Sequence, residues 1–272
     1  MLAEERYGEI LRLLQKKDVV RTSEIMKLCD VSSETVRKDL TQLESRGFLS
    51  RVHGGAVLPK SDSPLSSDQK NVYVPFQHRK NLNYREKQAM ALAAAQLVTE
   101  GQVIALDSGT SSGELAKVLK EKFRRLTIVT NSLANACVLM DHPGFTVIVS
   151  GGVLASDEQS FVSDLATLVV ENLHMDLMFL TTCGISFESG VTDQRLDEVL
   201  IHRTRIEHSK RLIVLADHTK FDTVSMCRVC GLEQVEAILT DSGLDSQIVE
   251  KYRAAGHQIL VAPPLEQTHS PG

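Results

Sequence analysis

A loop of small and hydroxyl-bearing residues begins at Asp107 in this 272-residue chain. It reads DSGTSSG, follows the apolar run VIAL, and precedes a helical pattern that starts at Glu114. Gly109 can make the turn, while Thr110 and Ser111 add hydroxyl groups beside the free N–H groups at a helix start. Such a loop can bind an anion. The alternative is that these residues only form the turn and cap the helix.

Three more loops place small or polar residues just after an apolar run. Asn131 follows LTIVT, Gly151 and Gly152 follow TVIVS, and Lys220 follows LIVLA after Asp-His-Thr. Ligands of open α/β sheets bind at the carboxyl ends of strands, so we expect one polar pocket there. A lysine in it could pair with a phosphate; otherwise it is a solvated loop lysine. Neither GxxxxGK[ST] nor GxGxxG occurs, which argues against a nucleotide-binding loop.

Asp193, Asp197, Glu198 and Lys220 could form an acid–base set for sugar-phosphate isomerisation. That chemistry needs a carboxylate base and a group that stabilises an oxyanion. Asp197 and Glu198, however, open a predicted helix, where acidic side chains interact favourably with the helix dipole. We therefore expect no catalytic residues, and an isomerase stands as the alternative.

The cysteines and histidines lack the spacing of metal ligands. Cys227 and Cys230 form a CxxC, but no second CxxC or HxxxH is present to complete a set of about four zinc ligands. We expect ordinary thiols. His202 and His208 lie six residues apart on one predicted helix, so they do not share a face, and we expect surface positions for both. No metal or cofactor is expected.

The first sixty residues carry three short helical patterns and a hairpin. Apolar residues repeat at helical spacing in each helix, Thr22 can cap the second, and Ser32 can cap the third. The expected elements are helices at 4–16, 23–29 and 33–46 and strands at 48–52 and 56–58. This order predicts a winged helix-turn-helix.

The third of these helices is expected to enter the major groove of double-stranded operator DNA. Arg and Lys side chains can read guanine, and Ser or Thr can reach bases or phosphates. The alternative is a protein–protein module of three helices. The residues expected to contact DNA are Thr22, Ser32, Ser33, Thr35, Arg37, Lys38, Arg51 and His53.

Charge divides the chain into two parts. Residues 1–60 contain 11 Lys and Arg against 9 Asp and Glu, a net charge of +2, while the remainder contains 19 against 26, a net charge of −7. The sum is the −5 of the whole chain. The acidic part would repel phosphates, which leaves DNA contact to the N-terminal segment.

A polar, proline-containing segment separates the two parts. After it, short apolar runs alternate with helical patterns, which is typical of an α/β fold with a mainly parallel sheet. We expect a winged helix-turn-helix domain at 1–58, a linker at 59–79 and an α/β domain at 80–272. No apolar run is long enough to span a membrane and no signal segment is evident, so a cytoplasmic protein is expected.

Two sets of motifs resemble the DeoR family of bacterial regulators. The first is VSSETVRKDLTQLESRGFLSRVHGGAVL; the second comprises LDSGTSS, LTIVTNSL, SGG, GVTD and ADHTKF. The resemblance implies a C-terminal domain that is similar in fold to ribose-5-phosphate isomerase. It also implies that this domain binds phosphorylated sugars or related metabolites as effectors. The effector-binding residues it implies are Asp107, Gly109, Thr110, Ser111, Asn131, Gly151, Gly152, Asp193 and Lys220.

These observations together predict a transcription regulator. We expect a repressor of a carbohydrate-utilisation operon that a phosphorylated sugar-like effector releases from DNA. One small DNA-binding unit makes few base contacts, so a homo-oligomer that reads repeated half-sites is expected. Activation instead of repression, and an isomerase with an accessory DNA-binding domain, remain as alternatives.

Overall fold

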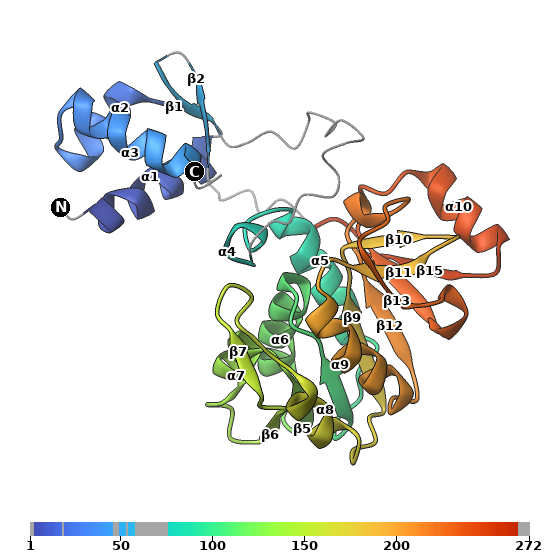
Figure 1. The fold of residues 1–272 in the computed structure, drawn as a ribbon. Coiled ribbons are helices and arrows are strands. Elements are labelled where there is room, and N and C mark those ends of the chain that lie inside the picture. Colours follow the sequence, from blue (N-terminus) through green and yellow to red (C-terminus); the bar gives the residue numbers. More distant parts are fainter. Residues whose placement is uncertain (1–2, 18, 46–48, 53, 58–75, 266–272) are drawn as a thin grey trace. The chain divides into compact units, whose positions relative to one another are not determined.

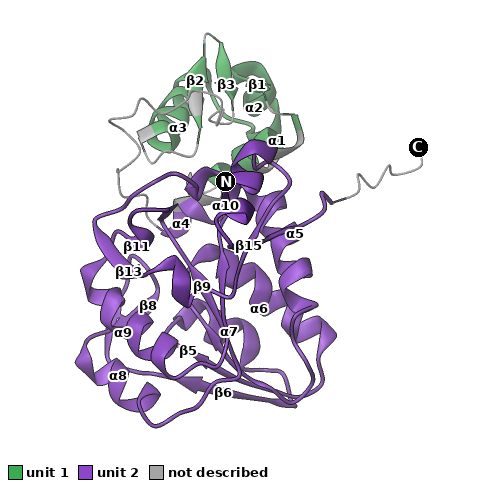
Figure 2. Ribbon diagram, turned by 90° about the vertical axis from the view of Figure 1, so that its right-hand side faces the viewer, with its two compact units in different colours: residues 1–69 green, residues 70–272 purple. Residues whose placement is uncertain are grey.

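The structure is a computed structural model that describes residues 3–17, 19–45, 49–52, 54–57 and 76–265 (Figure 1). The chain divides into two compact units, an N-terminal unit of residues 1–69 and an α/β unit of residues 70–272 (Figure 2). No helix among the described residues is long and apolar enough to cross a membrane.

The N-terminal unit contains three helices and a small antiparallel sheet with the order β1-β3-β2. Its elements are α1 (Ala3–Lys17), β1 (Val19–Arg21), α2 (Thr22–Cys29), α3 (Ser33–Ser45), β2 (Ser50–Val52) and β3 (Gly55–Val57). Ile10, Ile25 and Leu40 pack in the core between the helices. A bidentate ion pair from Arg6 to the buried Asp39, at 2.7 and 3.0 Å, joins α1 to α3. The winged helix-turn-helix fold predicted from the sequence is confirmed.

The main sheet of the α/β unit has seven parallel strands in the order β15-β14-β12-β9-β4-β5-β6. The strands are β4 (Val103–Leu106), β5 (Leu126–Thr130), β6 (Phe145–Val149), β9 (Leu177–Thr181), β12 (Leu212–Leu215), β14 (Ala237–Thr240) and β15 (Gln258–Val261). The helices are α4 (Phe76–Arg79), α5 (Tyr84–Ala95), α6 (Thr110–Lys122), α7 (Leu133–Leu139), α8 (Asp164–Val170), α9 (Leu196–Glu207) and α10 (Ser246–Ala254). The predicted α/β class is confirmed.

Two smaller sheets complete this unit. A hairpin joins β7 (Val153–Ala155) to β8 (Ser160–Val162), and β10 (Gly184–Ser186), β11 (Gly190–Asp193) and β13 (Cys227–Cys230) form an antiparallel sheet. Short 3₁₀ turns lie at η2 (His218–Lys220) and η3 (Leu232–Gln234). The sequence patterns predicted neither small sheet.

Side chains alternate between the two faces of the main sheet and build a separate core on each. Ile104 and Leu106 of β4 pack with α5, α6 and α7 on one face. Ala105, between them in sequence, packs with α8, α9, α10 and the antiparallel sheet on the other. Because both faces are covered, the strands are continuously apolar.

The chain runs outward from β4 in two directions. It passes from β4 through β5 to β6, then returns to β9 on the other side of β4 and continues through β12 to β14 and β15. The loops after β4 and β9 therefore leave toward opposite faces of the sheet. In open α/β sheets, this reversal of strand order creates a crevice at the carboxyl ends of the strands, where ligands bind.

Two element boundaries differ from the expectation in ways that affect this crevice. Helix α6 begins at Thr110, with Gly109 as its N-cap, rather than at Glu114. Part of the expected linker at 59–79 is helical, since α4 lies within it and Phe76 is buried. Thr110 and Ser111 therefore belong to the first turn of a helix, where backbone N–H groups are free.

Candidate functional site

A hollow lies at the carboxyl ends of β4, β9 and β12, where the strand order reverses. It is a shallow hollow that encloses about 590 Å³ of empty space, part of it open solvent. Its lining residues are Arg79, Leu82, Asn83, Lys87, Gly109, Thr110, Ser111, Thr181, Thr182, Cys183, Asp193, Leu215, Asp217, Thr219 and Lys220. We call this set the effector hollow.

Close packing of two loops shapes one wall of the effector hollow. A Cβ atom on Gly109 would lie 2.1 Å from Oγ1 of Thr181, so only glycine fits at the N-cap of α6. The loop after β4 therefore approaches the end of β9 directly. This approach places the first turn of α6, with Thr110 and Ser111, at the edge of the hollow.

Three cationic side chains from separate elements surround the same space. Lys87 of α5 is buried and donates to the carbonyl oxygens of Arg79 and Leu82, each at 2.5 Å. Arg79 forms an ion pair with Glu158 from the β7–β8 turn. Lys220 lies in η2 and makes no ion pair with any described side chain. Together with the α6 N-terminus, these charges make the hollow suitable for an anion.

Burial changes the protonation of several groups that line the effector hollow. Loss of solvent lowers the pKa of Lys87 to about 8, which leaves it mostly protonated at neutral pH. Burial raises the pKa of Asp193 above its ordinary value and that of Cys183 to about 12. Cys183 therefore stays a thiol. The carboxyl group of Asp193 can form a hydrogen bond with a ligand hydroxyl.

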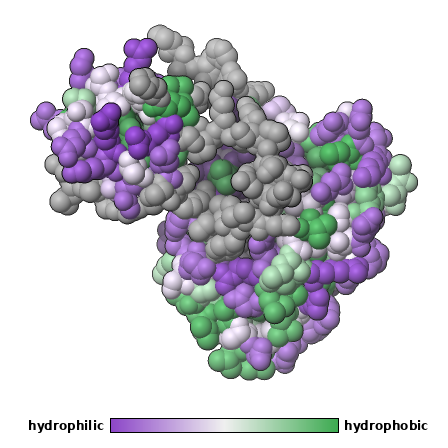
Figure 3. Space-filling view, turned by 45° about the horizontal axis from the view of Figure 1, so that its top comes forward, coloured by the Kyte–Doolittle hydropathy of each residue, from purple (hydrophilic) through white to green (hydrophobic). Residues whose placement is uncertain are grey.

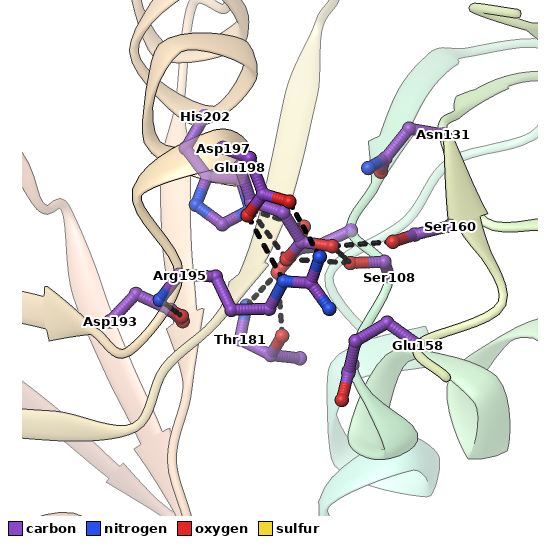
Figure 4. A network of polar contacts seen from close by, with 12 residues as sticks. Ser108, Asn131, Glu158, Ser160, Thr181, Asp193, Arg195, Asp197, Glu198 and His202 are labelled. Atoms are coloured by element: carbon purple, nitrogen blue, oxygen red, sulfur yellow. Dashed lines mark hydrogen bonds and ion pairs between the residues drawn. The ribbon is translucent and has the colours of Figure 1, made fainter. Parts of the chain in front are cut away.

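A buried polar network lies between the end of β4 and helix α9 (Figure 4). Asp107 accepts from the backbone N–H of Thr181 at 3.1 Å and its hydroxyl at 2.5 Å, and lies 2.9 Å from Nε2 of His202. Arg205 donates to Oδ1 of Asn131 at 2.6 Å and to the carbonyl oxygen of Leu106 at 3.3 Å. The network thus ties α9 to the ends of β4, β5 and β9.

Glu198 extends this network on the first turn of α9. Ser160 of β8 donates to its carboxylate at 2.5 Å, and Ser108 donates at 3.3 Å (Figure 4). Burial raises the pKa of Glu198. The buried side chain of Glu198 therefore links the hairpin, the β4 loop and α9 at one point.

The charges of the network stabilise one another. Burial alone would raise the pKa of Asp107, but His202 and Arg205 beside it hold that pKa below its usual range. Burial alone would lower the pKa of His202, but Asp107 raises it above its ordinary value. Asp107 is therefore ionised and lies against the buried Arg205 and His202, rather than facing the hollow as a free carboxylate.

The residues predicted to bind an effector fall into three groups. Gly109, Thr110, Ser111, Asp193 and Lys220 all line the effector hollow. Asp107 and Asn131 are buried in the network with α9, and Gly151 and Gly152 are not among the lining residues.

The alternative of an isomerase required Asp193, Asp197, Glu198 and Lys220 to act together. These four residues do not lie around one space in the structure. Asp193 and Lys220 line the hollow, but Glu198 is held by Ser160 and Ser108. Asp197 is exposed and pairs with Arg195 at 2.6 Å. Only two of the four therefore face the same space.

Sequence reasoning missed Lys87 and placed His202 wrongly. His202, expected at the surface, is buried, because it lies on the side of α9 that faces the sheet. Lys87 forms an i, i+3, i+4, i+7 stripe with Met90, Ala91 and Ala94, all of them buried. A lysine at the start of an apolar stripe was the available signal for a buried cation.

Helix α3 carries the residues predicted to read DNA. Ser33, Arg37 and Lys38 are exposed, and Lys38 pairs at 3.0 Å with Glu34. The ion pair joins two side chains that are more than three-quarters exposed, so it would yield readily to a phosphate. Oγ of Ser32 accepts from the N–H of Thr35 at 3.3 Å, as the predicted N-cap should.

The other predicted DNA contacts lie on α2 and the wing. Thr22 is the first residue of α2, and Arg21 rather than Thr22 occupies the N-cap. Arg51 of β2 is exposed and donates to Oγ1 of Thr41 on α3 at 2.7 Å, which ties the wing to the reading helix. His53 lies outside the described residues.

The described residues contain no group of three or more His, Cys, Asp or Glu side chains placed to hold a metal ion. Cys227 and Cys230 are free thiols on β13. Burial raises the pKa of Cys230 to about 12, so this thiol stays protonated at neutral pH.

A DNA-reading fold in one unit and a polar, cationic hollow at the strand ends of the other define a ligand-responsive transcription regulator as the class of protein. Comparison with known proteins gives the family. The DeoR-like helix-turn-helix domain matches residues 6–62, and the DeoR C-terminal sensor domain matches residues 82–242. The chain belongs to the DeoR family of DNA-binding transcription regulators.

Two relatives align over most of the chain. The HTH-type transcriptional regulator GolR of Listeria innocua is 33% identical over 95% of this chain and 98% of its own length. The glycerol-3-phosphate regulon repressor of Escherichia coli is 29% identical over 88% of this chain and 90% of its own length. Both are named as regulators, which agrees with the predicted class.

Among solved structures, ribose 5-phosphate isomerase A of Methanocaldococcus jannaschii overlaps with 51% of this chain and 55% of its own chain. The TM-score is 0.39 at 14% identity.

Proposed function

We propose that this regulator represses a carbohydrate-utilisation operon in the cytoplasm, and that a phosphorylated sugar or sugar derivative bound in the effector hollow releases it from operator DNA. The observation that carries the proposal is the convergence of the α6 N-terminus with Lys87 and Lys220 around one space. A phosphate is the metabolite group best matched to a helix N-terminus flanked by lysines.

The hollow offers separate partners for the two ends of such a ligand. The first turn of α6, with Thr110 and Ser111, would hold the phosphate oxygens. Asp193 and Asp217, which line the same space, would accept hydrogen bonds from sugar hydroxyls. A ligand with both a phosphate and hydroxyl groups would therefore satisfy more of the lining than inorganic phosphate.

Helix α9 would carry the signal away from the effector hollow. Thr181 lines the hollow and donates to Asp107, which lies against His202 of α9. A ligand that moves Thr181 would disturb a buried ion pair. Because buried ion pairs tolerate little displacement, α9 would shift with the ligand and alter the spacing of the DNA-reading helices.

The experiment measures operator affinity with and without a candidate effector. Fluorescence anisotropy would follow the full chain on labelled DNA from upstream of its own gene, with a panel of sugar phosphates, the unphosphorylated sugars and inorganic phosphate. At least one sugar phosphate should weaken binding tenfold or more, and its free sugar should not. No sequence-specific binding at any salt concentration would refute DNA regulation.

The variant Lys220→Ala separates the two halves of the proposal. It should keep operator affinity within about twofold and need at least tenfold more effector for release, since one charge on the phosphate is lost. Loss of operator binding in this variant would give Lys220 a structural role. Release that is unchanged would place the effector elsewhere. Turnover of a sugar phosphate by the full chain would instead favour the isomerase alternative.

A further inference from the structure

The exposed face of helix α3 carries a carboxylate beside its cations. Val36 and Leu40 hold the opposite face of the helix in the core of the N-terminal unit. The exposed residues of its first two turns are Ser33, Glu34, Arg37 and Lys38. Figure 3 shows mainly hydrophilic side chains on the side of this unit that is in view. A carboxylate on a surface that meets DNA is repelled by the phosphates, so its presence there needs a physical reason.

Glu34 contributes little to the fold of the N-terminal unit. Its side chain is 78% exposed and pairs at 3.0 Å with Lys38, which is 76% exposed. An ion pair so exposed to solvent stabilises a helix only slightly. Ser32 already caps this end of α3, because its hydroxyl oxygen accepts from the N–H of Thr35. Neither burial nor capping therefore requires a carboxylate at this position.

Three hydroxyl groups on and beside α3 are already hydrogen-bonded within the unit. Oγ of Ser32 accepts from the N–H of Thr35 and lies 3.0 Å from its Oγ1. Oγ1 of Thr41 donates to the carbonyl oxygen of Arg37 at 2.8 Å. These hydroxyls are less available to the edges of bases. Readout by α3 therefore depends mainly on the exposed charged side chains of its first two turns.

The edges of the base pairs in the major groove offer a carboxylate one well-matched partner. An ionised carboxylate only accepts hydrogen bonds. Guanine and thymine present acceptors in the groove, and adenine presents its N6 donor beside the N7 acceptor, which repels a negative charge. Cytosine presents the N4 donor. Reading helices direct their N-terminal residues at base edges, and Glu34 is the second residue of α3.

We propose that Glu34 determines sequence specificity by accepting a hydrogen bond from N4 of one cytosine in the operator. In the free chain, Lys38 holds the carboxylate from the next turn of the helix. On DNA, the lysine turns to a phosphate or to a neighbouring guanine. A site without that cytosine leaves the carboxylate facing acceptors and phosphates, so the same group that selects one sequence rejects the others. This contact depends on α3 as the reading helix and not on the proposed effector.

The test determines which DNA sequence the full chain prefers. Selection from a library of randomised duplexes gives the motif, and anisotropy titrations give the affinities. The native chain should select cytosine at one position and bind about tenfold more weakly when T·A replaces that C·G pair. In Glu34→Ala, the preference at this position should disappear while the rest of the motif persists.

The variant Glu34→Gln gives the more specific result. A glutamine amide pairs with N6 and N7 of adenine, so the preferred base at this position should change from cytosine to adenine. Both variants should also bind unselected DNA more tightly at low salt, because a negative charge near the phosphates is removed. A role in helix stability alone would change the unfolding temperature but not the preferred base.

The matched control is Glu24→Ala on α2, which removes another carboxylate paired with a lysine, Lys17, at 2.7 Å. It should leave the preferred motif unchanged. The proposal is overturned if the native chain selects no motif, if the affected position is not cytosine, or if Glu34→Ala selects the native motif. A preference lost at every position in Glu34→Ala would also overturn it, because that result would show that the side chain supports the helix instead of reading a base.

Discussion

At the scale of single residues, the two units use exposed and buried cations for different purposes. Arg37 and Lys38 on α3 remain exposed and are available to DNA. Lys87 is buried under the effector hollow, where its ammonium donates to backbone carbonyls. An exposed positive charge attracts phosphates at long range. A buried positive charge interacts strongly with a charged ligand group beside it, because little solvent screens the interaction.

The variant Arg37→Ala tests the role of the reading helix. We expect operator affinity to fall by about 10- to 100-fold, the loss typical for one base-contacting arginine. Effector binding, measured by isothermal titration calorimetry, should be unchanged because Arg37 is in the other compact unit. The control Lys210→Ala removes a similarly exposed charge from the α/β unit and should leave operator affinity unaltered. An Arg37→Ala variant with native affinity would refute its assigned contact.

Lys87 makes effector affinity depend on pH. Its pKa of about 8 is below the ordinary value of a lysine because of burial. An anion beside it raises that pKa again, so binding takes up a proton near pH 8 and affinity falls between pH 7 and pH 9.5. The loss is about tenfold for each unit of pKa that the anion restores. Calorimetry in buffers of different ionisation enthalpy would detect this proton uptake.

Two variants check the assignment of this pH dependence. Lys87→Met should bind the effector more weakly at pH 7 and lose the dependence, whereas Lys220→Ala should weaken binding and retain it. The same lowered pKa has a consequence for folding. The unfolded chain binds more protons between the two pKa values, so the free energy of unfolding should rise as pH increases above 8. Equal pH profiles for both variants would exclude Lys87 as the titrating group.

At the scale of elements, the twelve residues of α9 connect the edge of the effector hollow to the buried network. Its first turn follows β11, whose last residue Asp193 lines the effector hollow. Its buried side carries His202 and Arg205 against Asp107, and its outer side exposes Leu196 and Leu200. Ionic contacts hold α9 in a defined position, so the helix can shift as one rigid unit when those contacts change.

The variant Asp107→Ala tests whether the buried network holds α9. It leaves His202 and Arg205 buried without their carboxylate, and removal of one partner from a buried ion pair costs about 3–5 kcal/mol. Chemical denaturation of the α/β unit should show a loss of this order. The control Asp197→Ala removes the half-exposed carboxylate of a pair with Arg195 at the start of the same helix and should cost no more than about 1 kcal/mol. Equal costs for the two variants would contradict a network that stabilises the fold.

At the scale of the whole molecule, charge is divided between the two units. The first sixty residues have a net charge of +2 and the remainder −7. The acidic part repels the DNA backbone, so binding depends on local phosphate contacts by the N-terminal unit. The negative charge of the α/β unit thus keeps the phosphates of DNA away from that unit.

Salt should therefore weaken operator binding steeply and effector binding only slightly. A protein that makes about 6–10 phosphate contacts loses about 10³–10⁵-fold in affinity between 50 and 200 mM salt. A single phosphate group enclosed beside Lys87 is screened much less. Anisotropy titrations at four salt concentrations would measure the first slope, and calorimetry the second. A shallow slope for the operator would mean that the N-terminal unit makes few phosphate contacts.

Local sequence patterns were sufficient to predict those secondary-structure elements that cover the same residues as the pattern. The apolar runs at 103–106 and 126–130 became β4 and β5 without a shift, because a strand buried on both faces is apolar throughout. The cap of Ser32 on α3 was likewise predicted, since an N-cap is a contact over three residues. The antiparallel sheet of β10, β11 and β13 was not, because its strands have only three or four residues and β13 pairs with β11 across more than thirty residues of chain.

By itself, the sequence determined the two-part organisation of this protein, the winged helix-turn-helix, the α/β class and the loops at the strand ends. Only the tertiary structure decided which of those loops meet. The order of strands brings the ends of β4, β9 and β12 together around one hollow, and directs Asn131 and Asp107 into contact with α9 instead. It also buried Lys87, at the start of an apolar stripe, and His202, which had been expected at the surface. Strand order is set by contacts between residues distant in sequence, and such contacts leave no periodic trace in the chain.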